Sequence, residues 1–142
     1  MNPDAMVPVA ILLSSLLPGL VIFFLAEERH RLRTALNLAG AFTKVLLVGG
    51  ALYGVYHGHT FDSALPLVPD YPLRFSLDPL AMLFVSLSAG LWLLTTIYAV
   101  GYLEDSPNRS RFFGFFSLCV SATVGIAMAG NLFTLFIFYE LL

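Results

Sequence analysis

The residues best suited to ion chemistry are a carboxylate and an ammonium group that interrupt long apolar stretches. Glu140 closes a run that contains no ionisable charge from Phe112 to Tyr139. Lys44 is the one charged residue between residues 34 and 56 and lies near the middle of that run. A charged side chain deep in a bilayer is costly and usually belongs to a proton or ion path. Both residues are therefore candidates for proton or ion translocation.

The depth of Glu140 depends on where its helix begins. If a membrane helix starts at Asn131, Glu140 follows nine positions later (131 to 140), roughly 14 Å further in at ~1.5 Å per residue. That depth is about half of a hydrocarbon core ~30 Å thick. We therefore predict a carboxyl group near the membrane midplane. The alternative is a helix that starts elsewhere and leaves Glu140 at an interface as an ordinary anchor.

Lys44 is too far from either end of its run for its side chain to reach the interface easily. Thr34, Asn37, Ala41 and Lys44 recur at helical spacing on one face. We expect this polar and small stripe to face protein rather than lipid. Lys44 then belongs either to an ion path or to a structural pairing with another helix, and the sequence leaves both open.

The composition is that of an integral membrane protein. Hydrophobic residues make up 58% of the chain and charged residues 11%, against roughly 25% charged residues in a soluble domain. The formal net charge of -2 and the short, separated arginine clusters argue against a nucleic-acid partner. A single cysteine, Cys119, allows no internal disulfide and no cysteine-cluster metal site. We expect neither a metal nor a cofactor.

Apolar runs predict an all-α membrane protein with four transmembrane helices and the first half of a fifth. The whole chain, 1–142, is expected to be the N-terminal part of one membrane domain, with helices at about 5–26, 34–56, 79–102, 111–129 and 131–142. Asp78 followed by Pro79 is a strong helix-start signal. The run from Phe112 to Tyr139 is too long for a single crossing, so we divide it at Gly130-Asn131.

The connections carry most of the charge. Residues 27–33 read as a charged loop, residues 104–111 as a hydrophilic turn, and the proline-rich stretch 57–77 as a loop with a short extended piece at 73–76. Small residues recur every three or four positions in the fourth predicted helix and predict close helix packing there; they are Gly114, Ser117, Ser121 and Gly125.

Basic residues predict the orientation of the chain in the membrane. One side receives two connections that hold Arg29, Arg31, Arg33, Arg109 and Arg111, whereas the other side receives Arg74 alone. The side with more arginines is expected to be cytoplasmic. The N-terminus is then outside, and Glu140 is approached from the outer face.

Four motifs in fixed order resemble the antiporter-like subunits of respiratory complex I, of Mrp-type Na⁺/H⁺ antiporters and of membrane-bound hydrogenases. The motifs are Phe75-Ser76-Leu77-Asp78-Pro79-Leu80, Ile97-Tyr98-Ala99-Val100-Gly101-Tyr102, Arg111-Phe112-Phe113 and the stretch from Asn131 to Leu141. The resemblance is most specific from Leu73 to Leu142, and the Tyr-Glu-Leu-Leu ending looks most like the D-type Mrp subunit.

This resemblance implies a larger subunit in which a glutamate on the fifth helix pairs with a lysine on the seventh. Glu140 matches the glutamate by position and context. The partner lysine has no counterpart here, and Lys44, on the second helix, cannot simply replace it. Tyr139 stands where relatives often have Trp or Phe. We expect the natural polypeptide to continue, or a separate chain to supply the remaining helices and the lysine.

Three functions remain open at this point. The first is a proton or Na⁺/H⁺ translocating subunit of a multisubunit complex, with Glu140 as the protonatable group. The second is a membrane subunit of a proton-pumping oxidoreductase whose electron chemistry lies in other subunits, so that this chain carries no catalytic chemistry. The third is a structural or assembly piece without transport of its own. The expected partners are other membrane subunits and the lipid bilayer, in a prokaryotic cytoplasmic membrane.

Overall fold

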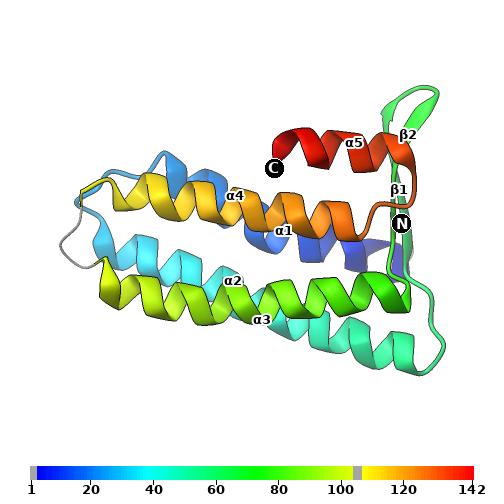
Figure 1. Ribbon diagram of the computed structural model, residues 1–142, viewed down its shortest axis with the longest axis horizontal. Coiled ribbons are helices and arrows are strands. Elements are labelled where there is room, and N and C mark those ends of the chain that lie inside the picture. The colour runs from blue at the N-terminus through cyan, green and yellow to red at the C-terminus, as the bar shows by residue number, and fades with distance from the viewer. Residues whose placement is uncertain (1–2, 104–106) are drawn as a thin grey trace.

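Four long helices run side by side, and a β-hairpin crosses one end of them (Figure 1). The computed structural model describes residues 3–103 and 107–142. Each long helix packs against two others, because α1 contacts α2 and α4, and α3 contacts the same two. The elements in chain order are α1 (Pro3–Phe23), α2 (His30–Tyr56), β1 (Asp62–Val68), β2 (Tyr71–Ser76), α3 (Pro79–Tyr102), α4 (Arg109–Ala127) and α5 (Leu132–Leu141).

Within the described residues, the four helices α1 to α4 are long and apolar enough to cross a membrane. The predicted all-α membrane protein with four spans is confirmed, since the structure is mostly helical, and the β-hairpin is an addition to that prediction. The short helix α5 has 10 residues, which rise roughly 15 Å, about half of a ~30 Å hydrocarbon core. Figure 1 shows α5 starting at the hairpin and running back over α4, and the C-terminus lies about midway along the bundle.

Two helix ends differ from the predicted ones around the first connection. The chain leaves α1 at Phe23, and two short turns follow, in which Leu25 N donates to the Ile22 carbonyl and Arg29 N to the Ala26 carbonyl. Residues 30–33, predicted as loop, form the first turn of α2. Because arginine is a good helix former, this charged stretch continues the helix beyond the apolar region instead of ending it.

The second connection also differs. Residues 104–106 of the predicted turn lie outside the described residues, and Arg109, Ser110 and Arg111 belong to α4 rather than to the turn.

The proline-rich stretch is a β-hairpin rather than a loop. β1 and β2 pair antiparallel, with Asp62 opposite Ser76 and Leu65 opposite Leu73, and the register shifts between Leu65 and Val68. The predicted extended piece 73–76 lies within β2. Prolines are tolerated here because both strands of a two-stranded sheet are edge strands. These prolines normally indicate a loop. They therefore hid the alternation of buried and exposed residues that is typical of a strand.

The bundle core is continuous with the hairpin. Phe75 of β2 is 1% exposed and belongs to the same apolar cluster as Ile11 of α1, Val85 of α3 and Met128 at the end of α4. The hairpin is therefore packed on the helices and forms a fixed end to the bundle. Hereafter "hairpin end" means the end at β1 and β2. The opposite end, with the α1–α2 and α3–α4 connections, is called the basic end.

Candidate functional site

The start of α5 is fixed by its own cap and by the hairpin. The Asn131 side chain accepts a hydrogen bond from Thr134 N at 2.8 Å and donates one to the Pro72 carbonyl at 2.9 Å. Arg74 N donates to Thr134 Oγ1 at 2.9 Å, and Gly130 N donates to the Arg74 carbonyl at 2.8 Å. An asparagine whose side chain satisfies a first-turn N–H is a strong N-cap. The predicted break at Gly130-Asn131 is confirmed, and it lies at the hairpin end.

Close packing sets the path of α5 along α4. A Cβ on Gly125 would lie 2.3 to 2.6 Å from the Phe138 ring, so only glycine leaves room for that ring. Phe138 also meets Phe75 edge-on, with ring centroids 5.7 Å apart. Gly114, Ser117, Ser121 and Gly125 are all buried on α4, as their spacing predicts. The helix that carries Glu140 therefore packs closely against α4 and β2.

Glu140 lies in the last turn of α5, on the face that points away from α4. Thr134 and Phe138 are the buried residues of α5, whereas Tyr139 and Glu140 are exposed. Residues two positions apart are about 200° apart around a helix, so Glu140 and Phe138 lie on opposite sides. Because α5 begins at the hairpin end and extends about halfway along the bundle (Figure 1), the carboxylate lies far from both ends of the bundle.

Lys44 lies in the interior of the bundle and is 0% exposed. Its Nζ donates to Ser15 Oγ of α1 at 2.5 Å and lies 5.1 Å from the centroid of the Trp92 ring of α3. Among residues 3–103 and 107–142, no carboxylate lies within ion-pair distance of Lys44. Its partners are thus a hydroxyl group and an aromatic face, which stabilise an ammonium by a hydrogen bond and a cation–π contact.

A row of buried polar groups continues from Lys44 toward the basic end. Ser121 Oγ lies 2.8 Å from both Ser15 Oγ and the Ser117 carbonyl, and Ser117 Oγ donates to Asn37 Oδ1 at 3.2 Å. Asn37 Nδ2 is a buried donor without a partner in the described part of the chain. Each hydroxyl group can both donate and accept a hydrogen bond. The row therefore joins α1, α2 and α4 through buried hydrogen bonds.

The predicted polar face of α2 is confirmed with one shift. Asn37, Ala41 and Lys44 are buried, whereas Thr34 is only half-buried and Arg33 takes its place in the interior. Arg33 precedes Asn37 by four positions and so lies on the same helical face. The spacing of Asn37, Ala41 and Lys44, continued one turn toward the N-terminus, predicts that Arg33 is buried. The charged stretch that contains Arg33 is instead predicted as a loop.

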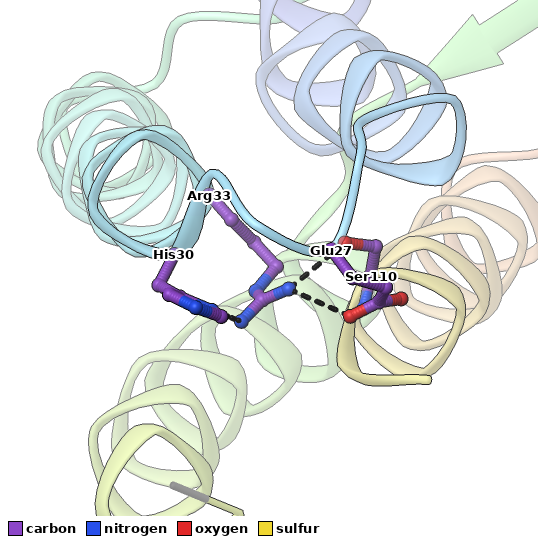
Figure 2. Close-up of polar contacts among 4 residues, drawn as sticks. All are labelled: Glu27, His30, Arg33 and Ser110. Carbon is purple, nitrogen blue, oxygen red and sulfur yellow. Dashed lines mark hydrogen bonds and ion pairs between the residues drawn. The ribbon is translucent and has the colours of Figure 1, made fainter. Parts of the chain in front are cut away.

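Arg33 and Ser110, both buried, form a polar cluster with the exposed residues Glu27 and His30 that joins three segments at the basic end (Figure 2). Its Nη1 donates to Glu27 Oε2 at 3.1 Å and to Ser110 Oγ at 2.9 Å. The Arg33 side chain is 2% exposed and that of Glu27 46% exposed. Glu27 also accepts a hydrogen bond from Ser110 N, at 3.0 Å to Oε1, in the first turn of α4. A carboxylate at a helix N-terminus is favoured by the helix dipole. The cluster therefore locks the α1–α2 connection onto α4.

The structure does not bring the two predicted site residues together. Lys44 contacts α1 and α3 in the interior of the bundle, whereas Glu140 lies on the exposed face of α5, which packs on α4 and β2. Ser15 and Trp92, the partners of Lys44, were not identified from the sequence, because nothing in the spacing of one helix reveals the register of its neighbours.

Part of this chain is similar in sequence to known membrane proteins. Residues 69–113 match the family described as NADH-ubiquinone oxidoreductase (complex I), chain 5 N-terminus. The Na⁺/H⁺ antiporter subunits A1 of Staphylococcus aureus strains JH9 and Newman are each 31% identical over 86 residues, which is 59% of this chain. The chain spans only 11% of the length of these relatives.

A solved structure shares the fold. A chain of the membrane-bound sulfane sulfur reductase, an archaeal respiratory membrane complex, superposes with a TM-score of 0.78 at 20% identity. The match covers 93% of this chain and 21% of the other. The curated relatives are A subunits, so the finer predicted likeness to the D-type subunit stays a prediction. The sequence motifs, the matched family and the shared fold together confirm the resemblance of this chain to the antiporter-like membrane subunits of complex I and of Na⁺/H⁺ antiporters.

Proposed function

We propose that this chain is the N-terminal part of a subunit that translocates protons or exchanges Na⁺ for H⁺, with Glu140 as the protonatable group. The observation that carries the proposal is the position of Glu140 on the exposed face of α5, nine positions (131 to 140) beyond the N-cap Asn131 at the hairpin end. A carboxylate at that depth cannot remain in contact with lipid without a large cost. The face is therefore expected to be covered by protein that supplies a partner.

The chemistry of such a site follows from two opposing effects. On its own helix, Glu140 is preceded by the apolar residues Phe133, Phe136 and Ile137. Removal from water favours the neutral carboxylic acid, whereas a nearby lysine ammonium favours the carboxylate. A carboxyl group balanced between these effects takes up a proton when the cation withdraws and releases it when the cation approaches. We expect the partner lysine to come from helices beyond the five described above.

Lys44 and the polar row form a second part of the proposal. The contacts from Lys44 through Ser15, Ser121 and Ser117 to Asn37 support a polar route through the interior toward the basic end. The competing role for Lys44 is structural, as an anchor between α1 and α3. The hydroxyl partner and the Trp92 ring are compatible with either role.

The proposed setting is a multisubunit complex in a prokaryotic cytoplasmic membrane. The curated relatives are subunits of Na⁺/H⁺ antiporters, which supports other membrane subunits as partners. The basic end holds Arg29, Arg31, Arg33, Arg109 and Arg111, and the positive-inside rule places this end in the cytoplasm. The hairpin and the N-terminus then lie outside.

A second candidate function has its own support. The matched family is a complex I chain, and the fold recurs in a respiratory membrane complex. The same subunit could therefore serve a redox-driven proton pump whose electron carriers lie in other subunits. The two functions differ in what drives proton movement: addition of Na⁺ in one case, and addition of an electron donor in the other.

The experiment is a comparison of Glu140→Gln with the wild-type complex in membrane vesicles. The amide keeps the shape of the side chain but cannot carry a proton or a charge. Proton movement should be lost in the variant while the complex still assembles. The matched control is Glu28→Gln, because Glu28 is an exposed carboxylate in the connection after α1. Full activity in Glu140→Gln would instead favour a structural role for this chain.

A further inference from the structure

A pocket of about 400 Å³ opens at the basic end of the bundle. It lies among the first turns of α2, the first turn of α4 and the end of α3, and it is lined by His30, Arg31, Thr34, Ala35, Val100 and Arg109. The lining has two parts. Arg31 and Arg109 bring guanidinium groups near the ends of their helices, whereas Ala35 and Val100 lie further along toward the membrane interior.

The contact between His30 and Arg33 determines which ring nitrogen of His30 carries the proton. Arg33 Nη2 lies 3.3 Å from His30 Nδ1 (Figure 2). A guanidinium group can only donate, so Nδ1 accepts and the proton is on Nε2. The imidazole thus adds an N–H donor to a residue that lines the pocket.

One further feature favours an anion at this place. The pocket lies at the N-termini of α2 and α4, whose two helix dipoles attract negative charge and outnumber the opposing C-terminus of α3. Guanidinium groups form paired, charge-assisted hydrogen bonds with phosphate oxygens. A phosphate group is therefore the ligand chemistry that the lining fits.

We propose that this pocket binds the headgroup of an anionic phospholipid, with Arg31 and Arg109 contacting its phosphate and Ala35 and Val100 contacting the start of its acyl chains. A lipid fits better than free phosphate because the pocket lies where two membrane spans begin and a third ends, and because one wall is apolar. Basic pockets between transmembrane helices on the cytoplasmic side are typical headgroup sites. The site does not depend on which ion the protein moves.

Lipid titrations of the purified, intact complex in detergent, followed by native mass spectrometry, test this proposal. The probes are phosphatidylglycerol, phosphatidylcholine and inorganic phosphate. We expect one saturable site on this chain that prefers phosphatidylglycerol. Because one basic residue near a headgroup contributes about 1 kcal/mol, Arg31→Gln should weaken that binding by about 5-fold. Arg109→Gln should weaken it similarly.

Arg111→Gln is the matched control, because Arg111 is exposed in the first turn of α4 but does not line the pocket. It should leave the affinity unchanged. Equal binding of phosphatidylcholine and phosphatidylglycerol would overturn the proposal, as would unchanged affinity in both Arg31→Gln and Arg109→Gln. If inorganic phosphate displaced the lipid at comparable concentration, the site would be one for free anions, and the lipid assignment would be wrong.

Discussion

The hydrogen bond between Lys44 and Ser15 gives a quantitative prediction about the buried ammonium. Ser15 Oγ accepts from Lys44 Nζ at 2.5 Å, and both residues are 0% exposed. A hydrogen bond to a charged group contributes about 1.5–3 kcal/mol, and a buried donor left without its acceptor costs a similar amount. Ser15→Ala should therefore lower the free energy of unfolding by about 1.5–3 kcal/mol more than a serine-to-alanine change that does not involve Lys44.

Ser14→Ala is the matched control, because Ser14 Oγ donates to the Ile11 carbonyl, just as Ser15 Oγ donates to the Leu12 carbonyl. Lys44→Met should alter the free energy of unfolding by less than about 1.5 kcal/mol, because methionine keeps the apolar stem and leaves no buried charge. In the Lys44→Met background, the excess cost of Ser15→Ala should fall by about 1.5–3 kcal/mol, and only the part due to the contact with Ser121 Oγ should remain.

Denaturant titration of the purified variants in mixed micelles measures these differences as a double-mutant cycle. An equal cost of Ser15→Ala in both backgrounds would show that the Ser15 hydroxyl group does not stabilise the Lys44 ammonium, as would a cost no greater than that of Ser14→Ala. Transport by the assembled Lys44→Met complex then separates the two proposed roles. A loss of transport with the complex intact indicates an ion path, whereas a subunit that fails to accumulate indicates a structural anchor. Unchanged assembly and unchanged transport would refute both roles.

Two further changes test the packing and the start of α5. Gly114→Ala should lower the free energy of unfolding by about 1–3 kcal/mol, because the new Cβ would lie 2.9 Å from the Phe23 Cα. Gly90→Ala is the control, because a Cβ there would have nothing within 4 Å; it should be neutral or stabilising in the same denaturant titration. Asn131→Ala should lower the free energy of unfolding by about 0.5–2 kcal/mol. It should also reduce ion flux in vesicles, because the start of the helix that carries Glu140 is no longer fixed. Asn131→Asp keeps the capping oxygen and should retain more stability than Asn131→Ala; equal losses would show that the cap is unimportant.

Local chemistry explains why part of the site could be predicted from the sequence. The start of α5 depends on Asn131 and the residues next to it, and the helix-start signal at Asp78-Pro79 is equally local; Ala81 N donates to Asp78 Oδ1 at 2.6 Å. The burial of Lys44 follows from spacing on one helix. Each of these features needs only a few consecutive residues or a single helical period.

Features that depend on several elements could not be predicted in this way. Ser15 is 29 positions from Lys44, and Ser110 is 77 positions from Arg33. These pairs form only when helices adopt a particular register, which hydrophobic periodicity does not encode. The hairpin was missed for a different reason, because prolines at edge-strand positions resemble those of a loop. The polar cluster of Arg33 could not be predicted, because a charged stretch between two apolar runs is usually exposed to water.

Ion flux through the intact complex carrying Glu140→Gln tests whether Glu140 is the protonatable group. Vesicles with wild-type and variant complexes, matched for the amount of assembled protein, would be compared for proton movement on addition of Na⁺ or of an electron donor. We predict that proton movement driven by either is abolished or strongly reduced in Glu140→Gln and is normal in Glu28→Gln. Wild-type proton movement in the assembled Glu140→Gln complex would contradict this prediction.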